Sequence, residues 1–384
     1  MTGSRTSQTF LPPVMEARRW IAGKSFPDDL PLINVSQAAP IDPPPEALRK
    51  QIAETAIAVP EAHIYGPVLG LPELRAEVAI QWSRAYGGTI LPENVGITSG
   101  CNQAFAAAIA SLTNQGNEVI LPTPWYFNHK MWLDMQGVGS VALQTGDDLL
   151  PSVEAAESLI TDKTRAIALV TPNNPAGVEY PSELVSDFYA LAKKHQIKLI
   201  VDETYKDFDS RTGAPHDLFA KPDWQDTLIQ LYSFSKAYRL TGHRVGAILT
   251  NPDRLQEIEK FLDTVAICPN QLGQHAALWG MQNLSQWLAG ERDEILARRA
   301  AISANMSILE GAGWQLLGLG AYFAYLKHPF EMPSDQLAQD LVEKAHVLAL
   351  PGTMFMPDSD PSGGQQMRIA FANVARPDIK VLFA

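Results

Sequence analysis

Seven short apolar runs, separated in several places by helical patterns, constrain the fold of this chain more than any other feature. Helical stretches such as 103–112 and 182–195 lie between them. Short apolar runs that alternate with helices predict an α/β fold with a largely parallel sheet, covered by helices. The runs are Asn94–Thr98, Glu118–Leu121, Ser140–Leu143, Ala166–Val170, Leu199–Val201, Leu228–Leu231 and Val245–Thr250.

The pattern changes near residue 275, which indicates a second domain. A chain of 384 residues is too long for one ordinary core. We predict a long helix from Gln274 to about Glu310, a strand at 321–326, a helix at 334–345 and a strand at 367–371. The first 45 residues are rich in proline and are expected to be irregular. The predicted large domain therefore spans 46–275, and the small α+β domain combines 276–384 with the N-terminal arm 1–45.

Charge and cysteine content narrow the class of protein. A net charge of −12 argues against binding to nucleic acid or to an anionic membrane surface. The two cysteines, Cys101 and Cys268, have no zinc-site spacing and suit a reducing compartment. Because the sequence shows neither a membrane-length apolar run nor a signal-peptide pattern, we expect a cytoplasmic protein without metal.

One lysine has neighbours that suit covalent chemistry. Lys236 ends the sequence Ser233-Phe234-Ser235-Lys236 between two apolar strands, and Arg244 follows eight residues later. The amine can form a Schiff base with an aldehyde cofactor, while the hydroxyls and the guanidinium hold a phosphate. That cofactor would be pyridoxal 5'-phosphate (PLP). Taken alone, the segment fits a surface lysine at a strand end better than a cofactor-binding lysine.

Other polar or aromatic residues follow the carboxyl ends of the predicted strands, where ligands bind in open α/β sheets. Asp202 ends a buried strand and needs a partner, such as a protonated pyridine nitrogen, although a helix cap is the alternative. Asn174 lies in a turn that can orient its amide toward a phenolate oxygen. Gly100 opens a helix where backbone N–H groups can approach a phosphate, and Tyr126 can stack on a flat ring.

Taken together, these motifs resemble the class I/II aminotransferases of PLP fold type I. The resemblance runs from about residue 30 to 375, with matching order and spacing. It implies a large domain in three layers around a mostly parallel, seven-stranded sheet, and a smaller α+β domain. The motifs that carry it are Tyr65…Gly70, Ser99-Gly100, Tyr126, Asn174-Pro175-x-Gly177, Asp202-x-x-Tyr205, Ser233-x-x-Lys236, Arg244 and Arg368.

The resemblance also implies a role for each matching residue. Lys236 is similar to the Schiff-base lysine that carries the proton leaving the substrate Cα, and Asp202 to the partner of the pyridinium nitrogen. Asn174 and Tyr205 resemble the pair that binds the ring O3', and Tyr126 resembles the stacking aromatic residue. The implied phosphate-binding residues are Ser99, Gly100, Cys101, Ser233, Ser235, Arg244 and Tyr65.

Two further implications concern assembly and substrate. In relatives, the tyrosine of the Tyr-x-x-x-x-Gly motif reaches across from a second subunit, so Tyr65 implies a homodimer. Arg368 resembles the arginine that binds the substrate α-carboxylate, since a guanidinium suits a carboxylate well. Ala38 stands where relatives often have a glycine that contacts substrate, and Cys101 is interpreted as a small filler.

The substrate is less constrained than the cofactor. A dicarboxylate needs a second cation, yet the chain has no Arg or Lys between Lys260 and Arg292, and Asn102 stands where one branch has a lysine. We therefore predict a ping-pong transfer from a neutral, aromatic or aliphatic L-amino acid to a 2-oxo acid. Other cations that could still supply charge are Lys130, His129, Arg18 and Arg19. A C–S lyase or cyclising enzyme, or a regulatory PLP-binding module, are alternative readings of the same apparatus.

Overall fold

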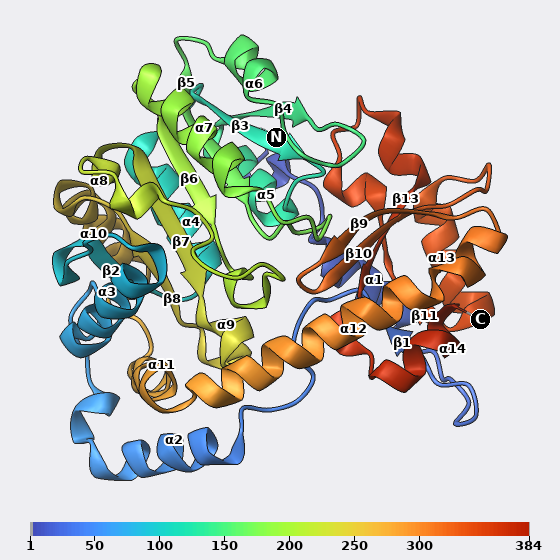
Figure 1. Cartoon of the computed structure of the whole chain (residues 1–384), viewed down its shortest axis with the longest axis horizontal. Helices are drawn as coiled ribbons and strands as arrows, with labels where there is room; N and C mark the ends of the chain where they lie inside the picture. The colour runs from blue at the N-terminus through green and yellow to red at the C-terminus, as the bar shows by residue number, and fades with distance from the viewer. Residues whose placement is uncertain (1–2, 384) are drawn as a thin grey trace.

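A seven-stranded sheet forms the centre of the larger part of the molecule (Figure 1). The computed structural model describes residues 3–383. The strands lie in the order β2-β8-β7-β6-β5-β3-β4, and all are parallel except β8, which runs antiparallel to both of its neighbours. The strands are β2 (Val95–Thr98), β3 (Glu118–Thr123), β4 (Gly139–Gln144), β5 (Thr164–Val170), β6 (Lys198–Asp202), β7 (Leu228–Ser233) and β8 (Gly246–Leu249).

Apolar side chains on both faces explain why the strand sequences are almost uninterrupted apolar runs. In β5, Ile167 and Leu169 pack into one hydrophobic cluster, while Ala166 and Ala168 pack into a second cluster on the other face. Successive side chains of a strand point to opposite faces, so a strand covered on both sides needs apolar residues at every position. The predicted covered, largely parallel sheet is confirmed.

Helices cover both faces of this sheet (Figure 1). One cluster contains residues of α3, α7 and α11, and the opposite cluster contains residues of α4, α5 and α10. None of the helices in residues 3–383 is long and apolar enough to cross a membrane. The helices of this part are α2 (Glu46–Ala58), α3 (Pro72–Tyr86), α4 (Cys101–Leu112), α5 (Phe127–Gln136), α6 (Val153–Leu159), α7 (Ser182–Lys194), α8 (Trp224–Thr227), α9 (Phe234–Ala237), α10 (Pro252–Ala266) and α11 (Gln271–Asn283).

A second, four-stranded antiparallel sheet lies beside the first, in the order β12-β13-β10-β9 (Figure 1). The long helix α12 extends from below the first sheet to this second one (Figure 1). The elements of this second part of the molecule are α12 (Ser285–Gly311), β9 (Gln315–Gly320), β10 (Phe323–Lys327), α13 (Ser334–Ala345), β11 (Val347–Leu348), β12 (Leu350–Pro351), β13 (Gln366–Ala370) and α14 (Ile379–Phe383).

The N-terminal arm is more regular than the sequence predicted. Helix α1 (Pro13–Ile21) interrupts the proline-rich segment, because a proline at the first helical position costs no hydrogen bond. Strand β1 (Ile33–Asn34) then pairs in parallel with β11. Backbone bonds from Val35 to Leu348 and from Ala370 to Val35 fix the arm against the second sheet. Residues 36–38 follow directly and enter the region between the two sheets.

Two further predictions are corrected. The expected helix from Gln274 to Glu310 is divided, because Leu284 leaves helical geometry and buries its side chain in the core. The strand expected at 321–326 is β10 at Phe323–Lys327, preceded by β9, which the sequence analysis missed. A turn at Ala321 and Tyr322 separates the two strands, with Ala321 at a positive φ of 45°.

Gly177 marks a close approach between the loop after β5 and the β9–β10 hairpin. Its φ is +76°, and a Cβ atom there would lie 2.6 Å from both the nitrogen of Gly320 and the oxygen of Phe323. These neighbours are backbone atoms, which cannot swing away as a flexible side chain can. The contact therefore requires a residue without a side chain, and it fixes one sheet relative to the other at the level of the cavity described below.

We expect Gly177→Ala to lower the free energy of unfolding by at least about 2 kcal/mol, since it adds a backbone clash to a left-handed conformation. Gly213→Ala provides the matched control, because Gly213 has a φ of +92° but no atom within 4 Å of its Cβ position. Denaturant unfolding of both variants measures the difference. Equal losses would show that the backbone contact contributes nothing beyond the φ preference.

Candidate active site

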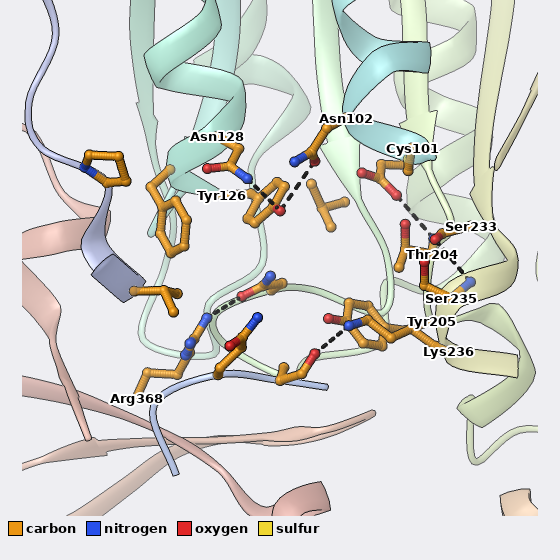
Figure 2. A pocket seen from close by; sticks show the side chains of 18 of the residues that line it. Cys101, Asn102, Tyr126, Asn128, Thr204, Tyr205, Ser233, Ser235, Lys236 and Arg368 are labelled. Carbon is orange, nitrogen blue, oxygen red and sulfur yellow. Dashed lines mark hydrogen bonds between the residues drawn. The ribbon is translucent and has the colours of Figure 1, made fainter. Parts of the chain in front are cut away.

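A cavity of about 400 Å³ lies at the carboxyl ends of the central strands, between the two sheets. It receives side chains from β6, β7, α4, α5 and β13, as well as from the N-terminal arm. In Figure 2, Lys236 and Arg368 reach into this space from different elements, and Tyr126 lies across from them. Predicted site residues in its wall are Ala38, Cys101, Tyr126, Asn174, Asp202, Tyr205, Ser233, Ser235, Lys236, Arg244 and Arg368.

Asp202 is a buried anion at the end of β6 and is held on both oxygens. The backbone N–H of Thr204 donates to Oδ1 over 3.0 Å, and Nε2 of His129 lies 3.3 Å from Oδ2. Burial raises the pKa of Asp202, but the interactions with His129 and Thr204 outweigh it and leave that pKa below its usual value. The carboxylate is therefore charged at neutral pH.

His129 is a site residue that the sequence analysis considered only as a source of charge for the substrate. It lies on α5, three residues after Tyr126, and its ring stacks on Phe105 at a centroid distance of 3.8 Å. Because it is buried against Asp202, it orients the carboxylate and cannot reach a substrate. The helical spacing from Tyr126 was the only signal available in the sequence.

Lys236 follows β7 within the short helix α9, and only part of it is exposed. Its Nζ donates to the carbonyl oxygen of Ala38 and lies 5.9 Å from the ring centre of Tyr205. Burial, together with the positive charges of Arg244 and Arg368, lowers the pKa of Lys236 to about 7. A large fraction of this amine is thus neutral, and nucleophilic, at physiological pH.

Donors for an anion gather where α4 begins. The guanidinium of Arg244 donates to Oγ of Ser235 over 3.2 Å, and Ser233 lines the same end of the cavity. Gly100 caps α4 with a φ of +88°, and a Cβ atom there would lie 2.2 Å from Nη2 of Arg244. The absence of a side chain thus lets the helix N-terminus and the guanidinium share one small space, which suits a phosphate group.

Arg368 is a cation that is 2% exposed at the other end of the cavity. It donates to Oδ1 of Asn174 over 3.0 Å and to the carbonyl oxygen of Ser36, while the rings of Phe323 and Phe355 flank it. Its Nε has no hydrogen-bond partner among the described residues. Burial lowers the pKa of Arg368 to about 10, so the group stays charged and suits a carboxylate ligand.

Tyr126 and Cys101 occupy the wall beside Asp202. The Tyr126 hydroxyl accepts from Asn128 over 3.0 Å and donates to Asn102 over 3.3 Å (Figure 2). Burial and the charge of Asp202 raise the pKa of the Cys101 thiol well above its usual value. The thiol therefore stays protonated, in keeping with its interpretation as a filler.

Three predicted site residues, Gly100, Ser99 and Tyr65, do not line the cavity wall, although Gly100 contributes the open space beside Arg244 described above. Ser99 precedes Gly100 but its backbone N–H donates to Gln103, within the first turn of α4. Tyr65 is 75% exposed and does not line the cavity of its own chain. A role for Tyr65 in this site consequently requires a second subunit.

The donor set fits PLP. A charged carboxylate faces the place of a pyridinium nitrogen, a partly neutral lysine can bond to an aldehyde, and the space left open at Gly100 lies beside Arg244 and two serines. Within the described residues, no group of three or more His, Cys, Asp or Glu side chains could hold a metal ion. Lys236, Asp202 and Arg244 are thus placed to bind three different parts of one cofactor.

Comparisons with known proteins agree with this chemistry. The sequence model of the family described as Aminotransferase class I and II matches residues 31–384. An aromatic aminotransferase of Arabidopsis thaliana is 28% identical over 364 residues, which cover 92% of this chain and 88% of the relative. An aspartate aminotransferase of Thermotoga maritima is 26% identical over 333 residues, covering 85% and 84%.

Solved structures share the fold. An aspartate aminotransferase from Thermus thermophilus, determined with maleate, superposes with a TM-score of 0.87 at 22% identity, covering 100% of this chain and 98% of the other. An aromatic aminotransferase from Pyrococcus horikoshii superposes with a TM-score of 0.84 at 23% identity and 96% coverage of both chains. These likenesses confirm the predicted architecture of two sheets and their helices.

The lowered pKa of Lys236 can be measured on cofactor-free protein by the rate of modification with an amine-reactive reagent. We expect a midpoint near pH 7, and Arg244→Gln should raise it, because the variant removes a positive charge near the amine. Mass spectrometry of the peptide reports the rate, and the exposed Lys50 in the same digest is the internal reference. A midpoint near the ordinary value of 10.5 would contradict the assigned environment.

Proposed function

The chain belongs to the class I and II aminotransferase family. We propose that its cavity binds PLP and transfers an amino group from a neutral, aromatic or aliphatic L-amino acid to a 2-oxo acid. The amino acid gives up its amino group and becomes a 2-oxo acid, while a second 2-oxo acid becomes an amino acid, in a ping-pong order. The observation that carries the proposal is the convergence of Lys236, Asp202 and Arg368 on one cavity.

PLP, when bound, supplies an aldehyde for the substrate amine and a ring that accepts the electron pair released at the substrate Cα. We assign the binding of its phosphate to Ser233, Ser235, Arg244 and the N-terminus of α4 at Gly100. Asp202 would hold the ring nitrogen, with His129 orienting the carboxylate. Asn174 and Tyr205 would contact the ring hydroxyl, and Tyr126 would cover the ring face.

Different residues of the chain bind the substrate, move its proton and close the cavity. Arg368 binds the α-carboxylate through its fixed guanidinium and so directs the Cα toward Lys236. The neutral Nζ of Lys236 would take the proton from the substrate Cα and pass it to the cofactor carbon that carried the aldehyde, which requires the lowered pKa described above. Ala38, whose carbonyl holds this amine, closes the cavity on the side of the N-terminal arm.

A neutral, aromatic or aliphatic L-amino acid is the proposed donor. Pro12, Val14, Met15 and Phe127 give the cavity an apolar wall next to Tyr126. Asn102, which stands where one branch of the family has a lysine, is uncharged and bonds to Tyr126. An apolar side chain is therefore better matched to this wall than a second carboxylate would be.

The proposal also covers the domain boundaries, the assembly and the cellular location of the protein. We propose that 46–275 acts as the cofactor-binding domain and that 1–45 with 276–384 acts as the second domain. The exposure of Tyr65 supports a homodimer in which this side chain reaches the partner's site. The free thiols Cys101 and Cys268 support a reducing location such as the cytoplasm, which fractionation of the source cell would test.

We expect Lys236→Ala to reduce transamination by at least about 1,000-fold, since it removes both the bond to the aldehyde and the base at the Cα. The visible spectrum of the wild-type protein should change when a neutral L-amino acid is added alone, and return when a 2-oxo acid follows. Lys221→Ala is the control, because Lys221 is paired with Asp217 and does not line this cavity. Turnover by Lys236→Ala, or 2-oxo acid formed steadily without an acceptor, would contradict the assignment.

The dimer is tested separately by sedimentation of the holoenzyme. Twice the chain mass of 42.0 kDa is expected, and Tyr65→Ala should weaken PLP retention although Tyr65 lies outside the cavity of its own chain. A monomer with full activity would contradict both the assembly and the role of Tyr65.

A further inference from the structure

One cation in the cavity wall has no role in the proposed function. The positively charged side chains that line the cavity are Arg18, Lys236, Arg244 and Arg368. The last three are assigned to the aldehyde, the phosphate and the α-carboxylate. Arg18 belongs to α1, the helix that the sequence analysis did not predict, and it therefore enters the site through an element that has no counterpart in the motifs discussed above.

The contact that holds Arg18 leaves its charge available. Its Nη2 donates to Oε1 of Gln37 over 2.8 Å. Gln37 is a neutral amide, so it orients the guanidinium without neutralising it, and the remaining N–H donors can serve a ligand. Among the described residues, Arg18 has no carboxylate within ion-pair distance.

The position of Gln37 places Arg18 in relation to the other cations. The carbonyl of Ser36 accepts from Arg368, the side chain of Gln37 accepts from Arg18, and the carbonyl of Ala38 accepts from Lys236. Consecutive Cα atoms lie only about 3.8 Å apart. Three successive residues thus arrange three cations around one small substrate, with Lys236 at its reacting carbon and Arg368 at its α-carboxylate.

The other cations considered from the sequence are occupied elsewhere. Arg19, the next residue of α1, pairs with Glu16 at 2.6 Å and is absent from the cavity wall. Lys130 pairs with Asp134 and lies 5.7 Å from the ring centre of Trp125. His129 is buried against Asp202. Arg18 alone among these candidates lines the cavity.

We propose that Arg18 binds the distal carboxylate of a dicarboxylic 2-oxo acid, which is the amino-group acceptor of this enzyme. The inference rests on the proposed function and adds the class of the second substrate. Arg18 is exposed, so its guanidinium can turn toward solvent when a neutral donor packs against Val14 and Met15. The same helix therefore serves an uncharged donor in one half of the cycle and a charged acceptor in the other.

Kinetics of the second half of the cycle test this assignment. Holoenzyme is first converted to its amino form with a neutral L-amino acid, and is then mixed with either 2-oxoglutarate or pyruvate. We expect Arg18→Gln to lower kcat/KM for 2-oxoglutarate by about tenfold to a hundredfold, the range for a charged hydrogen bond, and to change pyruvate less than about threefold. Arg18→Lys should recover part of the loss.

Two further variants serve as controls for the comparison between 2-oxoglutarate and pyruvate. Arg19→Gln, one residue along the same helix and paired with Glu16, should leave both acceptors unchanged. Arg368→Gln should weaken 2-oxoglutarate and pyruvate alike, because both carry the carboxylate next to the carbonyl. A loss in Arg18→Gln that is equal for the two acceptors, or no loss at all, would overturn the proposal.

Binding of unreactive acids gives a second readout that does not depend on turnover. Calorimetry with glutarate and butyrate should show tighter binding of glutarate to the wild-type holoenzyme and no such preference in Arg18→Gln. An equal preference in both proteins would overturn the role of Arg18. Failure of the proposed function would look different, since the wild-type enzyme would then transfer no amino group to any acceptor.

Discussion

Positive charge that the chain itself does not neutralise dominates the cavity. Lys236, Arg244 and Arg368 meet there, while Asp202 is the carboxylate of the cavity wall and already contacts His129. A buried cation without an anion is costly, as the lowered pKa values of Lys236 and Arg368 reflect. The cavity is thus built for anionic ligands: a phosphate at one end and a carboxylate at the other complete its charge balance.

The N-terminal arm fixes the positions of the charged side chains relative to one another. Main-chain pairing of β1 with β11 and of Val35 with Ala370 fixes the arm on the second sheet, while the carbonyl of Ala38 reaches a lysine that follows the first sheet. The backbone contact of Gly177 with Gly320 and Phe323 holds the same two parts together at a second point. Substrate contacts therefore depend on how the two sheets are held together, and a loss of either contact would misplace Arg368 relative to Lys236.

The sequence was most informative at positions where a single physical requirement, such as burial on both faces of a strand, determines which residue types are possible. Strand β5 is covered on both faces, so its apolar run is visible directly, and Asp202 is identifiable because a carboxylate at the end of a buried strand needs a partner. Helix α1 was missed because its prolines indicate irregular structure, and local sequence does not show that Pro13 occupies the first turn. His129 was missed as a partner of Asp202, since the contact joins α5 to β6, elements that are 73 residues apart by number (129 and 202).

Arg18 shows a distinction that the sequence alone does not reveal. Arg18 and Arg19 are adjacent, equally charged and on one helix, so no pattern in the sequence separates them. The helix turns about 100° per residue, which follows from 3.6 residues per turn, so the two side chains point in different directions. Arg18 meets Gln37, whereas Arg19 pairs with Glu16 one turn earlier on the same helix. Under the proposal for Arg18, recognition of the second substrate would depend on how α1 is rotated about its axis. That rotation is fixed where Ala17 is buried against residues of the second sheet such as Tyr325 and Leu350.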